Sequence, residues 1–191
     1  MADAGHYSFS RALSSGQTSF RSSFLRLRLR TMAVLSIVAA LAARLMLIML
    51  FLPFSALDKV LNFGPAVDQA AEAAPSRSLA TVLIFAGLGV EVFMSLAVLT
   101  GIADRLAALV LAAYCIVTAL LWKQFWKTPD FRLRGASHGR EVFWDFLKNL
   151  ALGGGFLALA FGASANGFEG FVSHPLASSH PYSLSPSAVA R

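Results

Sequence analysis

Residues 44–61 of the sequence read RLMLIMLFLPFSALDKVL, and this stretch decides the fold class. Its charged side chains are Arg44 at the start and Asp58 and Lys59 near the end. A helix needs about 20 apolar residues to cross the hydrocarbon core of a bilayer, because each residue adds about 1.5 Å. With the apolar residues that precede it, the stretch predicts a membrane-spanning helix within residues 32–61.

Three further apolar stretches follow, at residues 79–102, 105–122 and 143–162. Of the whole chain, 57% of the residues are hydrophobic and only 14% are charged, with a mean hydropathy of +0.65. Soluble domains carry about 25% charged residues, so the composition argues against a soluble globular enzyme. The sequence predicts an all-α integral membrane protein, a four-helix transmembrane bundle with its membrane domain over residues 32–163.

The two ends of the chain differ in composition from the spans. Residues 1–31 contain seven Ser, five Arg and one acid, Asp3, which predicts a basic, disordered cytoplasmic tail, although an organelle transit peptide has a similar composition. Residues 164–191 are rich in Gly, Ser, Pro and His and predict a flexible tail. The net charge of +6, with five Arg clustered before residue 31, favours an anionic lipid bilayer over nucleic acid as the partner.

The count of basic residues does not decide the orientation in the membrane, because seven Lys and Arg flank the spans on each side. The first helix usually dominates the positive-inside rule, and this places both termini in the cytoplasm.

Polar residues inside the spans are the candidate site, because each charge in hydrocarbon costs about 2.5–3.5 kcal/mol on insertion scales and requires a partner or a wet cavity. By helix rise, Arg44 lies about 21 Å deeper than Asp58, and Glu91 lies about 18 Å deeper than Leu79. The first two spans run antiparallel, so the sequence predicts an Arg44–Glu91 ion pair. Such a pair either locks the bundle or lines a ligand or proton site. The full set of candidates is Arg44, Asp58, Lys59, Glu91, Asp145, Lys148 and Asn149.

A second polar group is predicted at the outer membrane face. Asp145, Lys148 and Asn149 are spaced three and four residues apart and share a helix face. We expect Asp58 to contact Lys148, and Lys59 to reach Asp145 or lipid headgroups. Together they would form a polar mouth for an anion or a quinone-like headgroup, although interfacial snorkelling of the two lysines needs no function.

The sequence offers no residues for an intrinsic cofactor. All four histidines lie in loops or tails, so no span supplies the axial ligand of a b-type haem. Cys115 is the one cysteine, which excludes a dithiol relay and a zinc knuckle, and we expect it to be a small buried apolar residue. No metal site and no catalytic residue can be assigned. Gly153, Gly154 and Gly155 indicate close helix packing.

Several motifs resemble the DoxX family of four-helix bacterial membrane proteins. The segment from Arg44 to Lys59 resembles the family's opening span, although Ala56 stands where the family often has Gly. The other motifs that carry the resemblance are Gly87-Leu-Gly-Val-Glu91, Gly101-Ile-Ala-Asp-Arg105, Phe125-Trp126 and Phe146-Leu-Lys148-Asn149-Leu-Ala-Leu-Gly-Gly154. The resemblance implies an inner-membrane protein. Some relatives are linked to thiosulfate:quinone oxidoreduction, and others to redox complexes that resist oxidative stress.

Three functions are compatible with these patterns. The first is an accessory subunit of a quinone-linked membrane redox system, which binds a quinone in the bundle and takes electrons from an oxidoreductase partner. The second is a small transporter or permease gated by its buried charges. The third is a purely structural membrane protein, alone or as a homo-oligomer.

Overall fold

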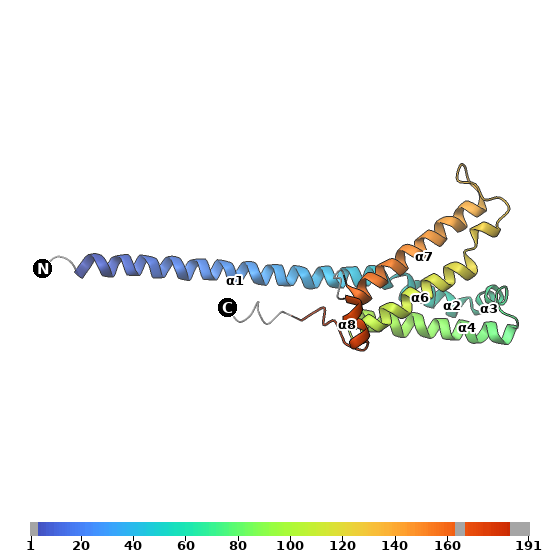
Figure 1. The fold of residues 1–191 in the computed structure, drawn as a ribbon, viewed down its shortest axis with the longest axis horizontal. Coiled ribbons are helices and arrows are strands. Elements are labelled where there is room, and N and C mark those ends of the chain that lie inside the picture. The colour runs from blue at the N-terminus through green and yellow to red at the C-terminus, as the bar shows by residue number, and fades with distance from the viewer. Residues whose placement is uncertain (1–3, 163–166, 184–191) are drawn as a thin grey trace. The chain divides into compact units, whose positions relative to one another are not determined.

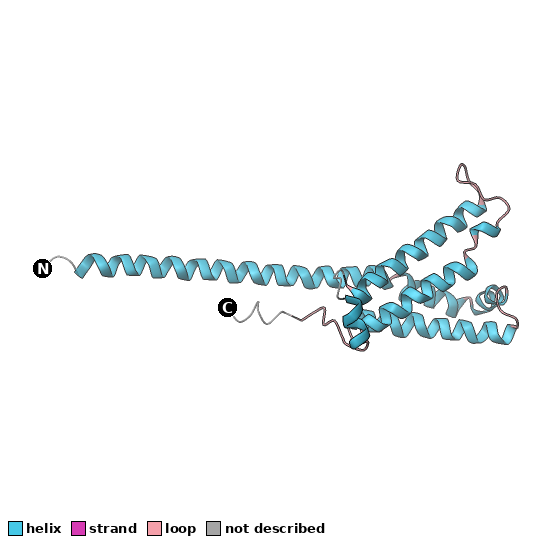
Figure 2. Ribbon diagram, viewed as in Figure 1, coloured by secondary structure: helices cyan, strands magenta, loops and turns pink. Residues whose placement is uncertain are grey.

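The computed structural model describes residues 4–162 and 167–183, and all regular structure in these residues is helical (Figures 1 and 2). Four helical segments are long and apolar enough to cross a membrane: Leu27–Leu61, Arg77–Thr100, Asp104–Lys127 and His138–Phe161. These findings confirm the all-α, four-span membrane bundle.

The first span begins in the long N-terminal helix described below. Ten further helical elements complete the spans and form the segments between and after them. They are η1 (Leu50–Ser55), α2 (Ala56–Leu61), α3 (Phe63–Ala71), α4 (Arg77–Gly89), η2 (Val90–Met94), α5 (Ser95–Thr100), α6 (Asp104–Trp122), η3 (Phe125–Lys127), α7 (His138–Phe161) and α8 (Gly167–Ser173). The stretches η1 and η2 are π-helical, and η3 is a 3₁₀ turn.

Helix α1 (Ala4–Ile48) begins far earlier than the composition of the N-terminus predicts. The chain divides into one unit of residues 43–180 and another formed by residues up to 42 and from 181 onward. The prediction of a disordered tail over residues 1–31 was wrong for residues 4–31, which are helical. The first proline of the chain is Pro53, so nothing in this region breaks a helix.

The unit of residues 43–180 is held together by α6, which packs along α7 and also contacts α5 and η2. Its core is apolar and fully buried, with Val98, Leu111, Cys115 and Phe156 each 0% exposed. Large apolar side chains on the outer faces, including Phe93, are exposed, as expected where helices face lipid. The burial of Cys115 confirms that it is a core residue.

The first loop, at residues 62–78, contains α3, which was not predicted. α3 packs against the start of α4 through a small apolar cluster around Val67, Ala70 and Ala80. The first half of α4 therefore lies beside α3, and only its later part and η2 lie beside the end of the first span. The second span therefore extends past the end of the first span. The prediction had assumed that Asp58 and Leu79 lie at the same depth.

Residues 167–180 also fold, where the sequence predicts a flexible tail. α8 contacts α7, and the following residues lie over the turn between α5 and α6. In that turn Gly101 and Ala103 have left-handed backbone with φ of 78° and 48°, and the Ala103 N–H donates to Ser178 Oγ at 3.1 Å. The remainder of the predicted tail, residues 163–166 and 184–191, lies outside the described residues.

Two π-helical stretches face each other inside the bundle. Pro53 lies in η1, where its missing N–H disturbs the regular hydrogen-bond ladder of the first span. η2 interrupts the second span at Glu91. The two stretches are in contact, and such π-bulges often occur at functional sites.

Candidate functional site

The centre of the bundle holds a polar cluster around Glu91, a side chain that is 1% exposed. Its Oε1 accepts three hydrogen bonds, from Lys59 Nζ at 2.7 Å, Tyr114 OH at 2.8 Å and Ser55 Oγ at 3.0 Å. Lys59 Nζ also donates to Ser55 Oγ at 2.6 Å. The four residues come from η1, α2, η2 and α6, so the cluster joins the first three spans.

The cluster lies deep in the membrane span. Along α6, Tyr114 is ten residues after Asp104 and eight before Trp122, or about 15 Å and 12 Å from the two ends. A charge at this depth is retained only where protein or water satisfies it. The Glu91 cluster is therefore an internal polar site and not an interfacial one.

A second buried ion pair lies at the end of α6 that begins with Asp104. Arg44 Nη2 contacts Asp104 Oδ2 at 2.5 Å, with the two side chains 4% and 0% exposed. Arg44 Nη1 also donates to the Val98 carbonyl, and Ser179 contributes both its N–H, at 2.9 Å from Asp104 Oδ1, and its hydroxyl, bonded to Asp104 Oδ2. Every oxygen of this carboxylate is occupied.

The predicted Arg44–Glu91 pair was wrong, since Arg44 pairs with Asp104 and Glu91 with Lys59. The physical reason is the register shift caused by α3. Arg44 and Lys59 are 15 residues apart on the first span, so the two ion pairs lie about 22 Å apart along it.

A third charged group lies near the end of α6 that closes with Trp122. Asp145 on α7 contacts Lys123 Nζ and Lys148 Nζ, each at 3.2 Å. Asn149 Nδ2 donates to the Asp145 carbonyl within the same helix. Asp145, Lys148 and Asn149 thus share one face of α7, as their spacing predicts.

The predicted contact of Asp58 with Lys148 was wrong, because Asp58 accepts a hydrogen bond from Asn62 one turn along its own segment. The prediction that Lys59 reaches Asp145 or headgroups was also wrong, because its ammonium turns inward to Glu91. The shift in register carries Lys59 below the membrane surface, where a buried carboxylate is its better partner.

One cavity of about 1120 Å³ connects the central cluster with the Asp145 group. Five of the seven predicted site residues line it, whereas Arg44 and Asp58 do not. The polar side chains at its deep part are Ser55, Lys59, Glu91 and Tyr114, and those toward its other end are Gln69, Thr118, Lys123, Asp145, Lys148 and Asn149. Its remaining walls are mostly apolar side chains of the first span, α4, α6 and α7.

One oxygen of the central carboxylate has no partner within the part of the chain that the structure describes. Glu91 Oε1 accepts three hydrogen bonds, whereas Glu91 Oε2 is buried and accepts none. A buried carboxylate oxygen without a donor is costly, and such atoms are rare in folded proteins. Glu91 is also one of the residues that line the cavity, so the oxygen without a donor belongs to a cavity-lining side chain.

Gly87 on α4 allows Tyr114 to reach Glu91. A Cβ atom at position 87 would lie 3.1 Å from the Tyr114 hydroxyl oxygen, which is tighter than ordinary van der Waals contact. On α7, Gly155 packs against Leu47 and Gly153 against α6, which agrees with the prediction of close packing, while Gly154 faces open space.

Several residues that the structure places in these polar groups were not among the predicted site residues: Ser55, Asp104, Tyr114, Thr118 and Lys123. Tyr114 could have been predicted as a site residue, since it is the single tyrosine in an otherwise apolar span. Asp104 was assigned to a turn, and its pairing depends on the folded segment around Ser179, which composition does not reveal. In the described residues, no three His, Cys, Asp or Glu side chains are grouped to hold a metal ion.

Comparison with known proteins gives one positive result. Residues 39–124 match the family model described as DoxX. The matched range includes both buried ion pairs and Tyr114, whereas α7 with Asp145 follows it. No curated protein and no solved structure matches the sequence.

Proposed function

The chain carries a DoxX domain over residues 39–124, and from this premise we propose that this multi-pass membrane protein is an accessory subunit of a quinone-linked redox system in the bacterial inner membrane. Its role would be to hold a quinone or quinol headgroup against the Glu91 cluster. The observation that carries the proposal is that Glu91 lines a large cavity and that its buried Oε2 has no donor among the described residues.

The chemistry of the cluster suits both forms of such a headgroup. A quinol hydroxyl can donate a hydrogen bond to Glu91 Oε2. A quinone carbonyl can accept one from Lys59, whose ammonium has three N–H donors and uses two of them, on Ser55 and Glu91. A site built from a few polar groups in an apolar slot is typical of small-molecule binding.

The size and walls of the cavity support an amphiphilic ligand. Ligand pockets usually measure about 300–1,000 Å³, so the observed volume of about 1120 Å³ leaves room for part of an isoprenoid chain beside the ring. The wall around the cluster is aromatic and aliphatic, with Phe51, Leu50 and Val90 beside Glu91 and Tyr114.

Electron transfer would depend on a partner. The one histidine in the spans, His138, is the exposed first residue of α7, and Cys115 is the only thiol, so the chain offers neither a buried haem ligand nor a dithiol. An oxidoreductase that delivers electrons to the bound quinone is therefore the partner class that fits. Co-purification in mild detergent followed by mass spectrometry tests this part of the proposal.

Binding of a short-chain ubiquinone or menaquinone analogue to the purified protein tests the ligand. A photoreactive azidoquinone should label peptides from α4 and α6, and excess unlabelled quinone should compete. Glu91→Gln should weaken binding by about tenfold or more, the loss expected for one charge-assisted hydrogen bond.

The control is Glu169→Gln, an exposed glutamate on α8 that does not line the cavity. Equal affinity of wild type and Glu91→Gln, with both folded, would contradict the proposed site. Solute uptake into liposomes that depends on Glu91, without quinone binding, would favour the permease instead.

A further inference from the structure

The cavity is a wedge that closes toward one membrane face. At its narrow end α7 and α1 approach so closely that a Cβ atom on Gly155 would lie 2.8 Å from Leu47 Cδ2. Leu47 lines the cavity, as does Leu152 one turn before Gly155, but no residue of α7 beyond Leu152 does. Leu47 and Leu152 are therefore the last residues of these two helices that line the cavity on this side.

Beyond Leu47 and Leu152 the bundle is filled by apolar side chains and then by a fully bonded ion pair. Val98, Leu111 and Phe156 are each 0% exposed, and none of them lines the cavity. Past them, Arg44 and Asp104 bond to each other and to Ser179. On this side of Glu91 the described residues place one buried hydroxyl, that of Ser95, before the apolar side chains of Val98, Leu111 and Phe156.

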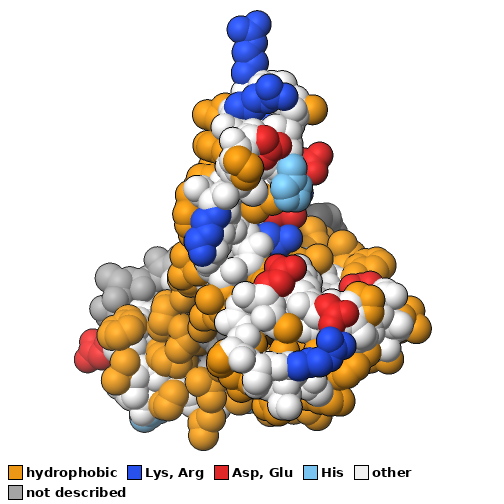
Figure 3. Space-filling view, turned by 90° about the vertical axis from the view of Figure 1, so that its right-hand side faces the viewer, with side chains coloured by type: hydrophobic (Ala, Val, Ile, Leu, Met, Phe, Trp, Pro, Cys, Tyr) orange, Lys and Arg blue, Asp and Glu red, His pale blue; other side chains and the backbone are white. Residues whose placement is uncertain are grey.

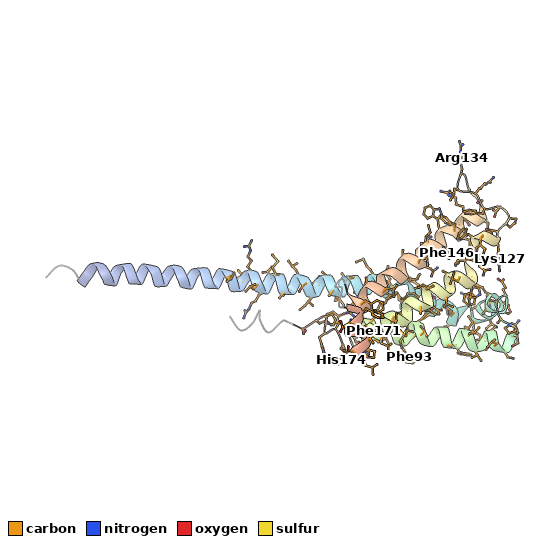
Figure 4. The ribbon with its side chains drawn as sticks, in the orientation of Figure 1. Phe93, Lys127, Arg134, Phe146, Phe171 and His174 are labelled. Atoms are coloured by element: carbon orange, nitrogen blue, oxygen red, sulfur yellow. The ribbon has the colours of Figure 1, made fainter. Side chains whose placement is uncertain are left out.

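In the opposite direction, polar side chains occur at intervals along an otherwise apolar cavity wall. Thr118 lies one helical turn beyond Tyr114, and Lys123, Asp145 and Asn149 follow at the end of α6 that closes with Trp122. Figure 4 places Lys127 and Arg134 at this end of the unit and Phe171 and His174 at the other. Basic and acidic side chains gather on this end, surrounded by hydrophobic ones (Figure 3).

The charges along this route do not cancel. In the deep part Lys59 and Glu91 neutralise each other, whereas toward the open end Lys123 and Lys148 share the single carboxylate of Asp145. The route therefore carries one net positive charge. At about 7 Å in water, one unit charge changes the free energy of a singly charged solute by about 0.6 kcal/mol, attractive for anions and repulsive for cations.

We propose that the Glu91 cluster has a single aqueous entrance, at the Trp122 end of α6, and that this entrance selects for an anionic polar group. The proposal rests on the cavity being the site of the proposed function and adds a route from water to that cavity. Because a quinone headgroup is uncharged, the anion that this route favours is a different molecule. The anionic group belongs either to a water-soluble anion or to the head of an amphiphile.

Thiol labelling in sealed vesicles tests the entrance without any quinone. Thr118→Cys in a Cys115→Ala background places a single thiol midway along the route. Leu133→Cys marks the face of the α6–α7 connection, and Ile102→Cys marks the opposite face, since these side chains are 67% and 69% exposed. The reagents are two membrane-impermeant methanethiosulfonates of similar size, an anionic sulfonate and a cationic trimethylammonium.

Thr118→Cys should react only from the side on which Leu133→Cys reacts, and native Cys115, one turn deeper in the closed core, should stay unmodified. After normalisation to a simple thiol in solution, the anionic reagent should react roughly five- to tenfold faster than the cationic one. Lys148→Gln leaves Lys123 paired with Asp145 and brings the net charge of the route to zero, so it should abolish this preference. Asn149→Cys on α7 is a second probe of the same route, used if Thr118→Cys does not fold.

Three results would overturn the proposal: reaction from the Ile102 side or equally from both sides, equal normalised rates for the two reagents, or reaction only with a lipid-soluble maleimide, which would mean entry from the bilayer. An anionic short-chain lipid that slows Thr118→Cys labelling, where inorganic phosphate does not, assigns the anion to an amphiphile. The reverse result assigns it to a soluble anion. Failure of quinone binding leaves these labelling results interpretable, so the two proposals fail separately.

Discussion

Arg44–Asp104 and Lys59–Glu91 are both buried ion pairs between different spans, yet their surroundings differ. Around Asp104, the guanidinium and Ser179 occupy both oxygens, and apolar core closes over the pair. Around Glu91, one oxygen takes three bonds and the other takes none from the described residues, and a cavity adjoins it. A carboxylate with both oxygens hydrogen-bonded indicates a structural ion pair. A carboxylate with one unbonded oxygen on a cavity-lining side chain indicates a binding site.

The largest effect is expected for Asp104→Asn, which leaves Arg44 buried without a counter-ion. Breaking a buried pair costs about 3–5 kcal/mol, and thermal unfolding in detergent should show a loss of this size. Asp68→Asn is the matched control, because Asp68 pairs with Arg77 at the surface and should cost at most about 1 kcal/mol. Similar losses for the two variants would show that the Arg44 pair is not structural.

Glu91→Gln should destabilise less, by about 2 kcal/mol, although it also removes a buried charge. The amide oxygen can keep the three bonds of Oε1, and Lys59, with its side chain 17% exposed, borders a cavity that water can fill. The same unfolding measurement checks this value. A loss of stability as large as that of Asp104→Asn would indicate that both ion pairs are structural.

Tyr114→Phe should cost about 1 kcal/mol of stability, the net value of one hydrogen bond, and should lower quinone affinity about tenfold. The control is Thr118→Val, since Thr118 lines the same cavity but bonds only to carbonyls of its own helix. Titration of a short-chain quinone measures both variants. Wild-type affinity in Tyr114→Phe would remove the tyrosine from the site.

Gly87→Ala should have the smallest effect, because its Cβ moves the Tyr114 hydroxyl by only a few tenths of an ångström. We expect about a threefold loss of quinone affinity with little change in unfolding temperature. Gly154→Ala meets no atom within 4 Å, so it should keep affinity and gain up to about 1 kcal/mol from helix propensity. Equal affinities would show that Gly87 does not position the tyrosine.

The spans and most of the polar candidates could be predicted from the sequence, because hydropathy and the cost of charge in lipid are local properties. The partners of those charges could not. They depend on how far α4 extends past the end of the first span, which is set by the packing of α3 around Val67 and Ala80. They also depend on the π-helical stretches at Pro53 and Glu91, which rotate side chains relative to a regular helix.

The closed end of the bundle was the least predictable part. Asp104 reads as a turn residue, and Ser178 and Ser179 read as part of a flexible tail. Their bonds form only because the left-handed backbone at Ala103 presents its N–H to the returning chain. A pairing between residues about 75 positions apart leaves no local pattern in composition.

Quinone affinity of two double variants tests the contrast between the ion pairs most directly, measured well below each variant's unfolding temperature. Lys59→Met with Glu91→Met removes the polar cluster without leaving a lone charge, and Arg44→Met with Asp104→Met does the same at the closed end. We predict that the first variant loses quinone binding and that the second retains it. Wild-type affinity in the Lys59→Met, Glu91→Met variant would contradict the assignment of the Glu91 cluster as the binding site.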